Sequence, residues 1–201
     1  MAQEAVKVVV IGDQAVGKTC ISSRFVDGTF KQDEKSTIGA SFATTFLPID
    51  GNNMKIVIWD TAGQEKYRSM VGMYYRGANV ALICYDITSQ SSFDSLEGWY
   101  TDLMKTALPD VSIAIVGNKL DLEYMRVISA AQGSAFAEKH NGLFFEVSAQ
   151  SGANVMEMFT EAVKKSKTQP PDPQAQKNND KVNVEKEPPK EPSRRRFCSL
   201  F

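Results

Sequence analysis

Residues 12–19 read GDQAVGKT, which matches the pattern G-x-x-x-x-G-K-[ST] and constrains the fold more than any other stretch. The preceding segment, Val6–Ile11, is mostly β-branched and apolar, as in a strand that is buried on both faces. In the following segment Ile21 and Phe25 are four positions apart, which is the spacing of one helix face. A strand, a glycine-containing loop and a helix in this order are the structural context of a phosphate-binding P-loop.

The residue types in this loop suit the binding of phosphate groups. Gly12 and Gly17 allow a tight turn that points successive backbone N–H groups into one concavity, and the helix that begins at Gly17 adds its positive end. The ammonium of Lys18 can contact β- and γ-phosphates, and the hydroxyl of Thr19 is a hard oxygen ligand for Mg²⁺. We therefore expect a nucleoside phosphate to bind here; the alternative is a glycine-rich turn that happens to carry a lysine.

The composition is that of a globular protein with one domain and a short remainder. The chain has 201 residues, of which 42% are hydrophobic, and a formal net charge of −1, which gives no indication of a nucleic-acid surface. The three cysteines are too far apart for a disulfide framework or a metal site, which suits a reducing cytosol, and we expect Cys20 and Cys84 to be small buried hydrophobes. The N-terminus has no signal-peptide pattern and no glycine at position 2, and the longest apolar runs are strand-sized, so we expect no membrane span.

Strand and helix patterns alternate along the chain. Apolar runs predict strands at Val6–Ile11, Ser41–Ile49, Met54–Trp59, Asn79–Asp86, Ser112–Val116 and Leu143–Val147. Helices are expected after the P-loop, within residues 60–77, from a cap at Ser91 or Ser92 to before Pro109, over Ser129–His140 and over Val155–Val163. This order predicts an α/β fold of the P-loop NTPase type, with a six-stranded, mostly parallel sheet and helices on both faces. The hairpin at residues 41–59 would supply one antiparallel edge strand.

The composition changes sharply after residue 167. Residues 169–192 contain six of the eight prolines and few apolar side chains, so they cannot bury enough surface to offset the entropy of the chain. We expect residues 1–168 to form the domain and residues 169–201 a disordered tail. The tail ends with Arg194–Arg196 and Cys198–Phe201; the latter fits the prenylation pattern C-a-a-X, and its terminal Phe favours a geranylgeranyl group. Because one lipid binds a membrane only marginally, the arginines would add attraction to anionic lipid.

A second motif, Asp60–Gln64, follows an apolar strand. Asp60 stands where a carboxylate holds the magnesium ion of a P-loop site, through a water molecule. The backbone N–H of Gly63 can approach a γ-phosphate closely. Gln64 can donate to and accept from a water molecule, so it can orient a nucleophile without being a strong base.

A third and a fourth motif end the last two strands. The carboxylate of Asp121, in the segment NKLD at residues 118–121, can accept two hydrogen bonds from the N1–H and N2–H₂ donors of guanine, which adenine does not offer. The stem of Lys119 can lie over the base plane. In the segment EVSA at residues 146–149, small residues would let the backbone N–H of Ala149 reach the base oxygen. Taken alone, each segment could be a polar turn at a strand end.

With these motifs the chain resembles the Ras superfamily of small GTPases and, within it, the Rab family. The resemblance covers roughly Val6 to Lys167 and includes five nucleotide motifs in order. The segments that are specifically Rab-like are Ser36–Gly39 with Phe42, Trp59–Glu65 and Tyr74–Ala78. Thr37–Phe42 and Met73–Tyr75 resemble the endosomal Rabs.

The resemblance implies GTP or GDP and Mg²⁺ as ligands. Thr19, Asp60 and, only with the γ-phosphate present, Thr37 would hold the metal, and Gln64, Lys18 and Gly63 would serve catalysis. Phe30 would pack against guanine, and the loops near Thr37 and Gln64 would be switches that GTP orders. The nucleotide would contact Asp13, Gln14, Ala15, Val16, Gly17, Lys18, Thr19, Cys20, Phe30, Thr37, Gly63, Asn118, Lys119, Asp121, Ser148, Ala149 and Gln150.

The same resemblance implies partners. Effectors would read an exposed apolar patch of Phe42, Trp59 and Tyr74, whose alternative role is plain hairpin core. An exchange factor, a GTPase-activating protein and a prenyl-binding escort or dissociation inhibitor would act on the chain, which we expect to be monomeric. Prenylation of Cys198 and the basic Arg194–Arg196 would place it on the cytoplasmic face of endosomal or other vesicle membranes, in exchange with the cytosol.

The leading functional interpretation is a GTP-operated switch of vesicle traffic in which slow GTP hydrolysis ends the active state. Gln14 is larger than the residue usual in relatives, so we expect it to hinder water positioning or an activating arginine, which contributes about 10³–10⁵ in rate. One alternative is a guanine-nucleotide-binding scaffold with little or no hydrolysis, against which Gln64 argues. Another is a nucleoside kinase, which would need a second substrate site and a basic lid.

Overall fold

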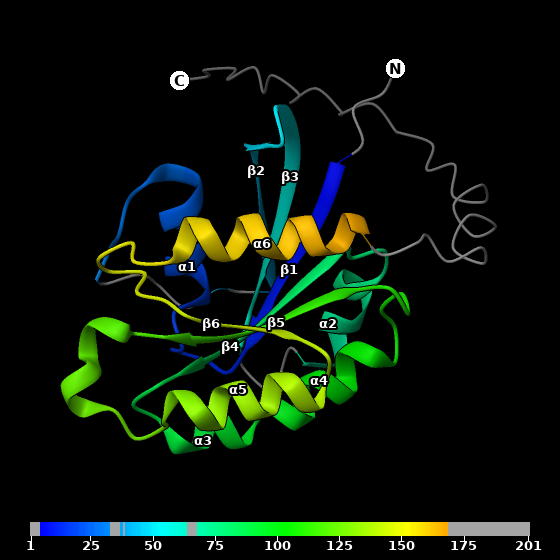
Figure 1. Ribbon diagram of the computed structural model, residues 1–201. Coiled ribbons are helices and arrows are strands. Elements are labelled where there is room, and N and C mark those ends of the chain that lie inside the picture. The colour runs from blue at the N-terminus through cyan, green and yellow to red at the C-terminus, as the bar shows by residue number, and fades with distance from the viewer. Residues whose placement is uncertain (1–4, 33–36, 38, 64–67, 169–201) are drawn as a thin grey trace, which may run out of the picture.

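The computed structural model describes residues 5–32, 37, 39–63 and 68–168 (Figure 1). Its strands are β1 (Ala5–Gly12), β2 (Ala40–Ile49), β3 (Asn52–Thr61), β4 (Val80–Asp86), β5 (Ser112–Asn118) and β6 (Leu143–Glu146). Its helices are α1 (Lys18–Asp27), α2 (Arg68–Tyr75), α3 (Gln90–Asp94), α4 (Leu96–Met104), α5 (Ala130–Lys139) and α6 (Val155–Thr168), with a 3₁₀ helix at Leu120–Met125. The predictions for Gln64, for the tail at 169–201, for Arg194–Arg196 and for Cys198 lie outside the described residues.

The six strands form one sheet in the order β2-β3-β1-β4-β5-β6. All neighbouring pairs are parallel except β2 and β3, which are antiparallel and place β2 at an edge. The turn between these two strands consists of Asp50 and Gly51, with φ of 50° and 78°, and a two-residue hairpin turn of this kind requires positive φ at both positions. The predicted six-stranded, mostly parallel sheet with one antiparallel edge strand is confirmed.

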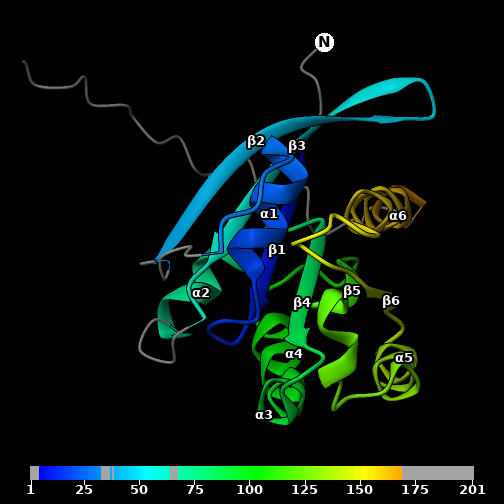
Figure 2. The same cartoon turned by 90° about the vertical axis from the view of Figure 1, so that its left-hand side faces the viewer.

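The central strand β1 separates two halves of the core, because its successive side chains point to opposite faces of the sheet. Val8 and Val10 belong to one buried cluster, with Phe159 of α6. Val9 belongs to the other, with Trp99 of α4. Figures 1 and 2 show α1 and α6 over one face of the sheet and α3, α4 and α5 over the other, so the prediction of helices on both faces is also confirmed.

The predicted helix cap at Ser91 or Ser92 is wrong, because the capping residue is Ser89. The Ser89 hydroxyl accepts a hydrogen bond from the backbone N–H of Ser92, so α3 begins at Gln90. Ser91 and Ser92 lie inside α3, and the buried Ser92 hydroxyl accepts instead from the backbone N–H of Asp86. At the other end of the chain, α6 continues to Thr168, beyond the predicted Val163. Within the described part of the chain, no helix is long and apolar enough to cross a membrane.

Candidate functional site

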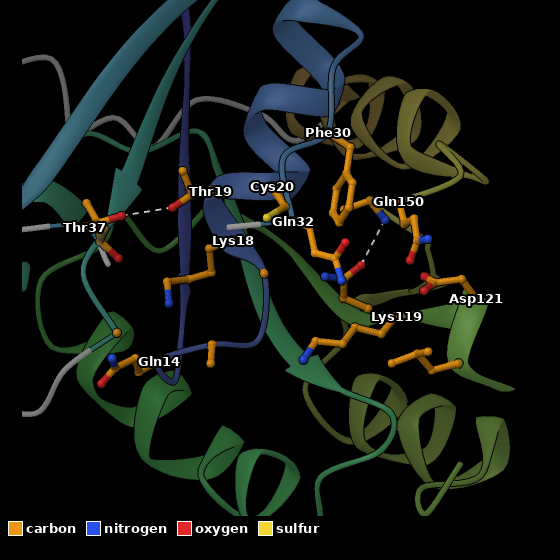
Figure 3. A pocket seen from close by; sticks show the side chains of 17 residues that line it. Gln14, Lys18, Thr19, Cys20, Phe30, Gln32, Thr37, Lys119, Asp121 and Gln150 are labelled. Carbon is orange, nitrogen blue, oxygen red and sulfur yellow. Dashed lines mark hydrogen bonds between the residues drawn. The ribbon is translucent and has the colours of Figure 1, made fainter. Parts of the chain in front are cut away.

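A pocket of about 440 Å³ opens where the loops after β1, β3, β5 and β6 meet (Figure 3). The carboxyl ends of parallel strands are the usual ligand position in such sheets. Many of the predicted site residues line this pocket: Gln14, Ala15, Gly17, Lys18, Thr19, Cys20, Phe30, Thr37, Gly63, Asn118, Lys119, Asp121, Ala149 and Gln150. Asp13, Val16, Asp60 and Ser148 bond to lining residues from behind, and Gln64 lies outside the described residues.

The glycines of the P-loop, and Gly63 beside it, are required by close contacts or by positive φ. Gly12 and Gly17 have φ of 139° and 92°, a region that side chains disfavour. A Cβ at Gly12 would overlap the Cys84 carbonyl, and one at Gly63 would overlap both the Asp13 carbonyl and the Lys18 ammonium. The backbone of Gly63 therefore lies directly against the P-loop.

Lys18 is buried and held by the loop that precedes it. Its Nζ donates to the carbonyls of Gly12 (2.9 Å) and Asp13 (2.7 Å). Burial lowers the pKa of Lys18, while the nearby Asp60 and Asp13 carboxylates oppose that shift. The ammonium is thus fixed at one end of the pocket, where it can meet an anionic group (Figure 3).

Three oxygen atoms from three different segments meet beside the P-loop. Thr19 Oγ1 lies 2.6 Å from Asp60 Oδ2 and 2.9 Å from Thr37 Oγ1, and Thr37 Oγ1 lies 3.4 Å from Asp60 Oδ2. Neighbouring ligands in a Mg²⁺ octahedron are about 3 Å apart, because each lies about 2.1 Å from the ion. The hydroxyl oxygens of Thr19 and Thr37 therefore suit a magnesium ion in both chemistry and spacing. Asp60, which accepts from Thr19, stands where the sequence predicts a carboxylate that holds the ion through water.

The opposite end of the pocket is built around Asn118. Its Nδ2 donates to the Val16 carbonyl (2.8 Å) and its Oδ1 accepts from the Ala149 N–H (3.2 Å), so one side chain joins the P-loop to the loop after β6. Ser148 donates to Asp121 Oδ1 at 2.5 Å, which fixes that carboxylate from behind. Phe30 and Asp121 lie at this same end in Figure 3.

Lys119 is oriented by an ion pair with Asp86, a residue outside the NKLD segment. Its Nζ lies 2.6 Å from Asp86 Oδ2, at the end of β4, and its backbone has a φ of 69°. The other carboxylate oxygen of Asp86 accepts hydrogen bonds from the N–H and the hydroxyl of Thr88. The Lys119 stem is therefore held along one wall of the pocket.

The predicted aromatic patch forms a row on the β2–β3 hairpin and α2. The centre of the Trp59 ring lies 5.9 Å from that of Phe42 and 5.4 Å from that of Tyr74. Lys7 Nζ lies 5.1 Å from the centre of the Trp59 ring. Phe42 is 70% exposed, whereas Trp59 and Tyr74 are half-buried and pack on the core. The patch and the hairpin core are thus not exclusive alternatives, since Trp59 takes part in both.

Some residues at the site were not found from the sequence. Gln32, Thr61 and Leu122 line the pocket. Gln32 and Leu122 belong to no motif, and Thr61 lies in the Asp60–Gln64 motif, but no role at the site was predicted for it. Conversely, the expectation that Cys20 is buried is wrong: it is half-exposed and lines the pocket, because α1 starts at the pocket rim. Cys84 is buried as predicted, and burial raises the pKa of its thiol to about 12.

The fold and the pocket define a nucleotide-binding P-loop domain. A sequence model of the Ras family matches residues 7–168, so the chain belongs to the Ras family. It is therefore a GTPase that binds GTP and GDP with Mg²⁺.

Two of the similar proteins carry Rab names. The chain is 47% identical over 161 residues to the GTP-binding protein ypt5 of Schizosaccharomyces pombe, covering 79% of this chain and 76% of that protein. It is 46% identical over 155 residues to the putative ras-related protein Rab-5B of Dictyostelium discoideum (77% and 72%) and 44% identical over 154 residues to Rab-4 of that organism (77% and 75%). These similarities agree with a place in the Rab family and its endosomal group.

Proposed function

We propose that this chain is a Rab-type switch that recruits effectors to vesicle or endosomal membranes while GTP is bound and ends the signal by slow hydrolysis. One observation carries the proposal. Thr37, which lies between α1 and β2, shares its oxygen cluster with Thr19 of the P-loop and Asp60 of β3. A segment outside the P-loop thus reaches the metal position, so its placement can depend on the nucleotide.

At the phosphate end the residues have separate roles. Thr19 and Thr37, with Asp60 through a water molecule, would hold Mg²⁺, which when bound would neutralise charge on the phosphate oxygens. Lys18 would bind those oxygens, and the N–H of Gly63, whose backbone lies against the P-loop, would donate to the γ-phosphate. Gln64 orients the attacking water. The backbone N–H groups of residues 13–20 contact the remaining phosphate oxygens.

At the base end Asp121 would select guanine by accepting from N1–H and N2–H₂. The N–H of Ala149, which donates to Asn118 Oδ1 in this structure, would contact the exocyclic oxygen as a shared donor. Phe30 and the Lys119 stem cover the ring faces, and Ser148 acts through Asp121, to which it donates. The bridging Asn118 keeps the P-loop and the base loop together.

Slow hydrolysis is supported by the position of Gln14. This residue lines the pocket at the end where Lys18 lies, and its side chain is exposed (Figure 3). A long side chain there occupies space that an activating arginine or an ordered water needs.

The patch of Phe42, Trp59 and Tyr74 is the proposed effector surface. An exchange factor, an activating protein and a prenyl-binding escort are the further partners, and residues 1–168 are the proposed domain. Prenylation of Cys198 in the tail at 169–201, together with Arg194–Arg196, attaches the monomer to the cytoplasmic face of endosomal or related membranes.

Single-turnover GTP hydrolysis, followed for hours beside Gln64→Leu, tests the switch. We expect a slow rate in the wild-type protein that falls further in the variant. Equal hydrolysis rates at the background level in both proteins would favour the alternative, a guanine-nucleotide-binding scaffold with little or no hydrolysis. A second variant, Gln14→Gly, should hydrolyse faster than the wild type if Gln14 is the hindrance.

A further inference from the structure

Arg24, in the last turn of α1, binds three backbone carbonyls. Its Nη1 donates to Gly28 (2.6 Å), its Nε to Ala149 (2.8 Å) and its Nη2 to Gln150 (2.6 Å). Among the described residues, no carboxylate lies within ion-pair distance of this guanidinium. The side chain therefore serves backbone groups, two of which are more than a hundred residues away in the sequence.

Helix capping explains only part of this arrangement. A cation in the last turn of a helix interacts favourably with its carbonyl end, and the bond to Gly28, the capping residue of α1, is of that kind. The bonds to Ala149 and Gln150 reach a different loop, the one that lines the base end of the pocket.

The bond to Ala149 orients the next N–H group. In a trans peptide the carbonyl and the following N–H point in opposite directions, and the chain contains no cis peptide among the described residues. Because the Ala149 carbonyl faces Arg24, the Gln150 N–H points away from it. Within the described part of the chain this N–H has no hydrogen-bond partner, so it is available to an acceptor in the pocket.

The bond to Gln150 orients a second group. With the Gln150 carbonyl turned to Arg24, the Ser151 N–H points the other way and donates to Ser148 Oγ (3.0 Å). That hydroxyl in turn donates to Asp121 Oδ1 (2.5 Å). A continuous series of hydrogen bonds thus joins Arg24 to the carboxylate at the base end.

We propose that Arg24 is a positioning residue for purine recognition, which sets the peptides of residues 149–151 so that the Gln150 N–H meets the exocyclic oxygen at C6 and the Ser151 N–H holds Asp121 through Ser148. This inference rests on the proposed function of the base end. Arg24 does not touch the base; it acts through the loop. Only an arginine suits the role, since its planar fork reaches three carbonyls at once, whereas a lysine ammonium is a point donor on a flexible stem.

The test compares release of GDP with release of 6-thio-GDP, in which sulfur, a weak acceptor, replaces the oxygen at C6. We expect the wild-type protein to release 6-thio-GDP about tenfold faster than GDP, because the loss of one good hydrogen bond corresponds to about a tenfold change. In Arg24→Met the rate of GDP release should rise about tenfold. The ratio of the release rates of 6-thio-GDP and GDP should then approach one. Arg24→Lys should lie between the two, and the exposed Arg76→Met should match the wild type.

Equal acceleration of both nucleotides in Arg24→Met, with the ratio unchanged, would overturn the inference, because loss of fold stability weakens both alike. Should that variant not fold, Arg24→Lys decides the question by the same ratio. A wild-type protein that bound both nucleotides equally well would instead contradict the proposed role of the N–H groups at the base end.

Discussion

Trp99 Nε1 donates a 2.7 Å hydrogen bond to Asp13 Oδ1, and this bond joins the interior of α4 to the P-loop. The indole is almost fully buried, so the aromatic side chain both fills the core and fixes a loop residue. The carbonyl of the same Asp13 accepts from Lys18 Nζ. The contact therefore links helix packing to the position of the phosphate-binding loop.

Replacing Trp99 with Phe should lower the free energy of unfolding by about 2–4 kcal/mol. Part of this loss comes from the cavity that the smaller ring leaves, and part comes from the Asp13 carboxylate, which loses its hydrogen-bond donor. GDP release should become faster, since the loop loses its anchor. Urea denaturation measures the loss of stability, and the rate of GDP release measures the effect on the loop. Trp59→Phe is the control, because it keeps Trp99. If Trp99→Phe released GDP at the wild-type rate, the proposed link would be excluded.

Gly63→Ala should slow GTP hydrolysis by about tenfold to a hundredfold, because its Cβ would displace the Asp13 carbonyl or the Lys18 ammonium. GDP affinity should change less, since Gly63 faces the γ-phosphate in the proposed site. The matched control is Gly72→Ala in α2, where the nearest atom to the new Cβ is 3.8 Å away and alanine favours the helix. If both variants hydrolysed GTP at the wild-type rate, the close contact at Gly63 would be irrelevant to catalysis.

Asp121→Asn should lower GTP affinity at least about a hundredfold, since two hydrogen bonds to a charged acceptor are lost. The amide can instead donate to the C2 oxygen of xanthine, so XTP should bind the variant better than GTP does. Ser148→Ala is expected to weaken GTP binding less, because it removes only the donor behind Asp121. Competition with a labelled nucleotide measures all three; unchanged preference for GTP in Asp121→Asn would refute the assignment of guanine selection to this residue.

Stability should fall as pH rises above about 9, partly because of Cys84. Burial raises the pKa of this thiol from 9.0 to about 12, so the unfolded chain loses its proton first and binds fewer protons than the folded chain. Between these two values the free energy of unfolding should decrease by about 1.4 kcal/mol per pH unit for this group. Denaturation of Cys84→Ala over pH 8–11 should show a shallower decrease than the wild type, and parallel curves would argue against this contribution.

Local patterns were sufficient to predict the sheet and most of the pocket. The strand at Val6–Ile11 is apolar on both faces, and the P-loop glycines permit only a few backbone conformations, so element type and motif chemistry follow from short stretches. Because the carboxyl ends of parallel strands share one edge, motifs that end different strands must meet. Asn118 and Ala149 are within hydrogen-bond distance for this reason.

The supporting contacts could not be predicted in this way. Asp86, Trp99 and Arg24 belong to no motif, and each acts on a residue far away in the sequence. Trp99 is buried in the core, yet the direction of its N–H depends on how α4 lies against the P-loop. The cap at Ser89 was missed because three serines compete within four residues, and only the backbone decides among them: Ser89 is extended, whereas Ser91 and Ser92 lie inside α3.

The sequence by itself determined the class of fold, the phosphate and base motifs and their order, since each depends on local backbone preference and on the period of apolar residues. Tertiary structure alone decided which side chains hold those motifs in place. Such contacts depend on packing between α1, α4 and the loops beyond β6, and packing joins residues that no local pattern relates.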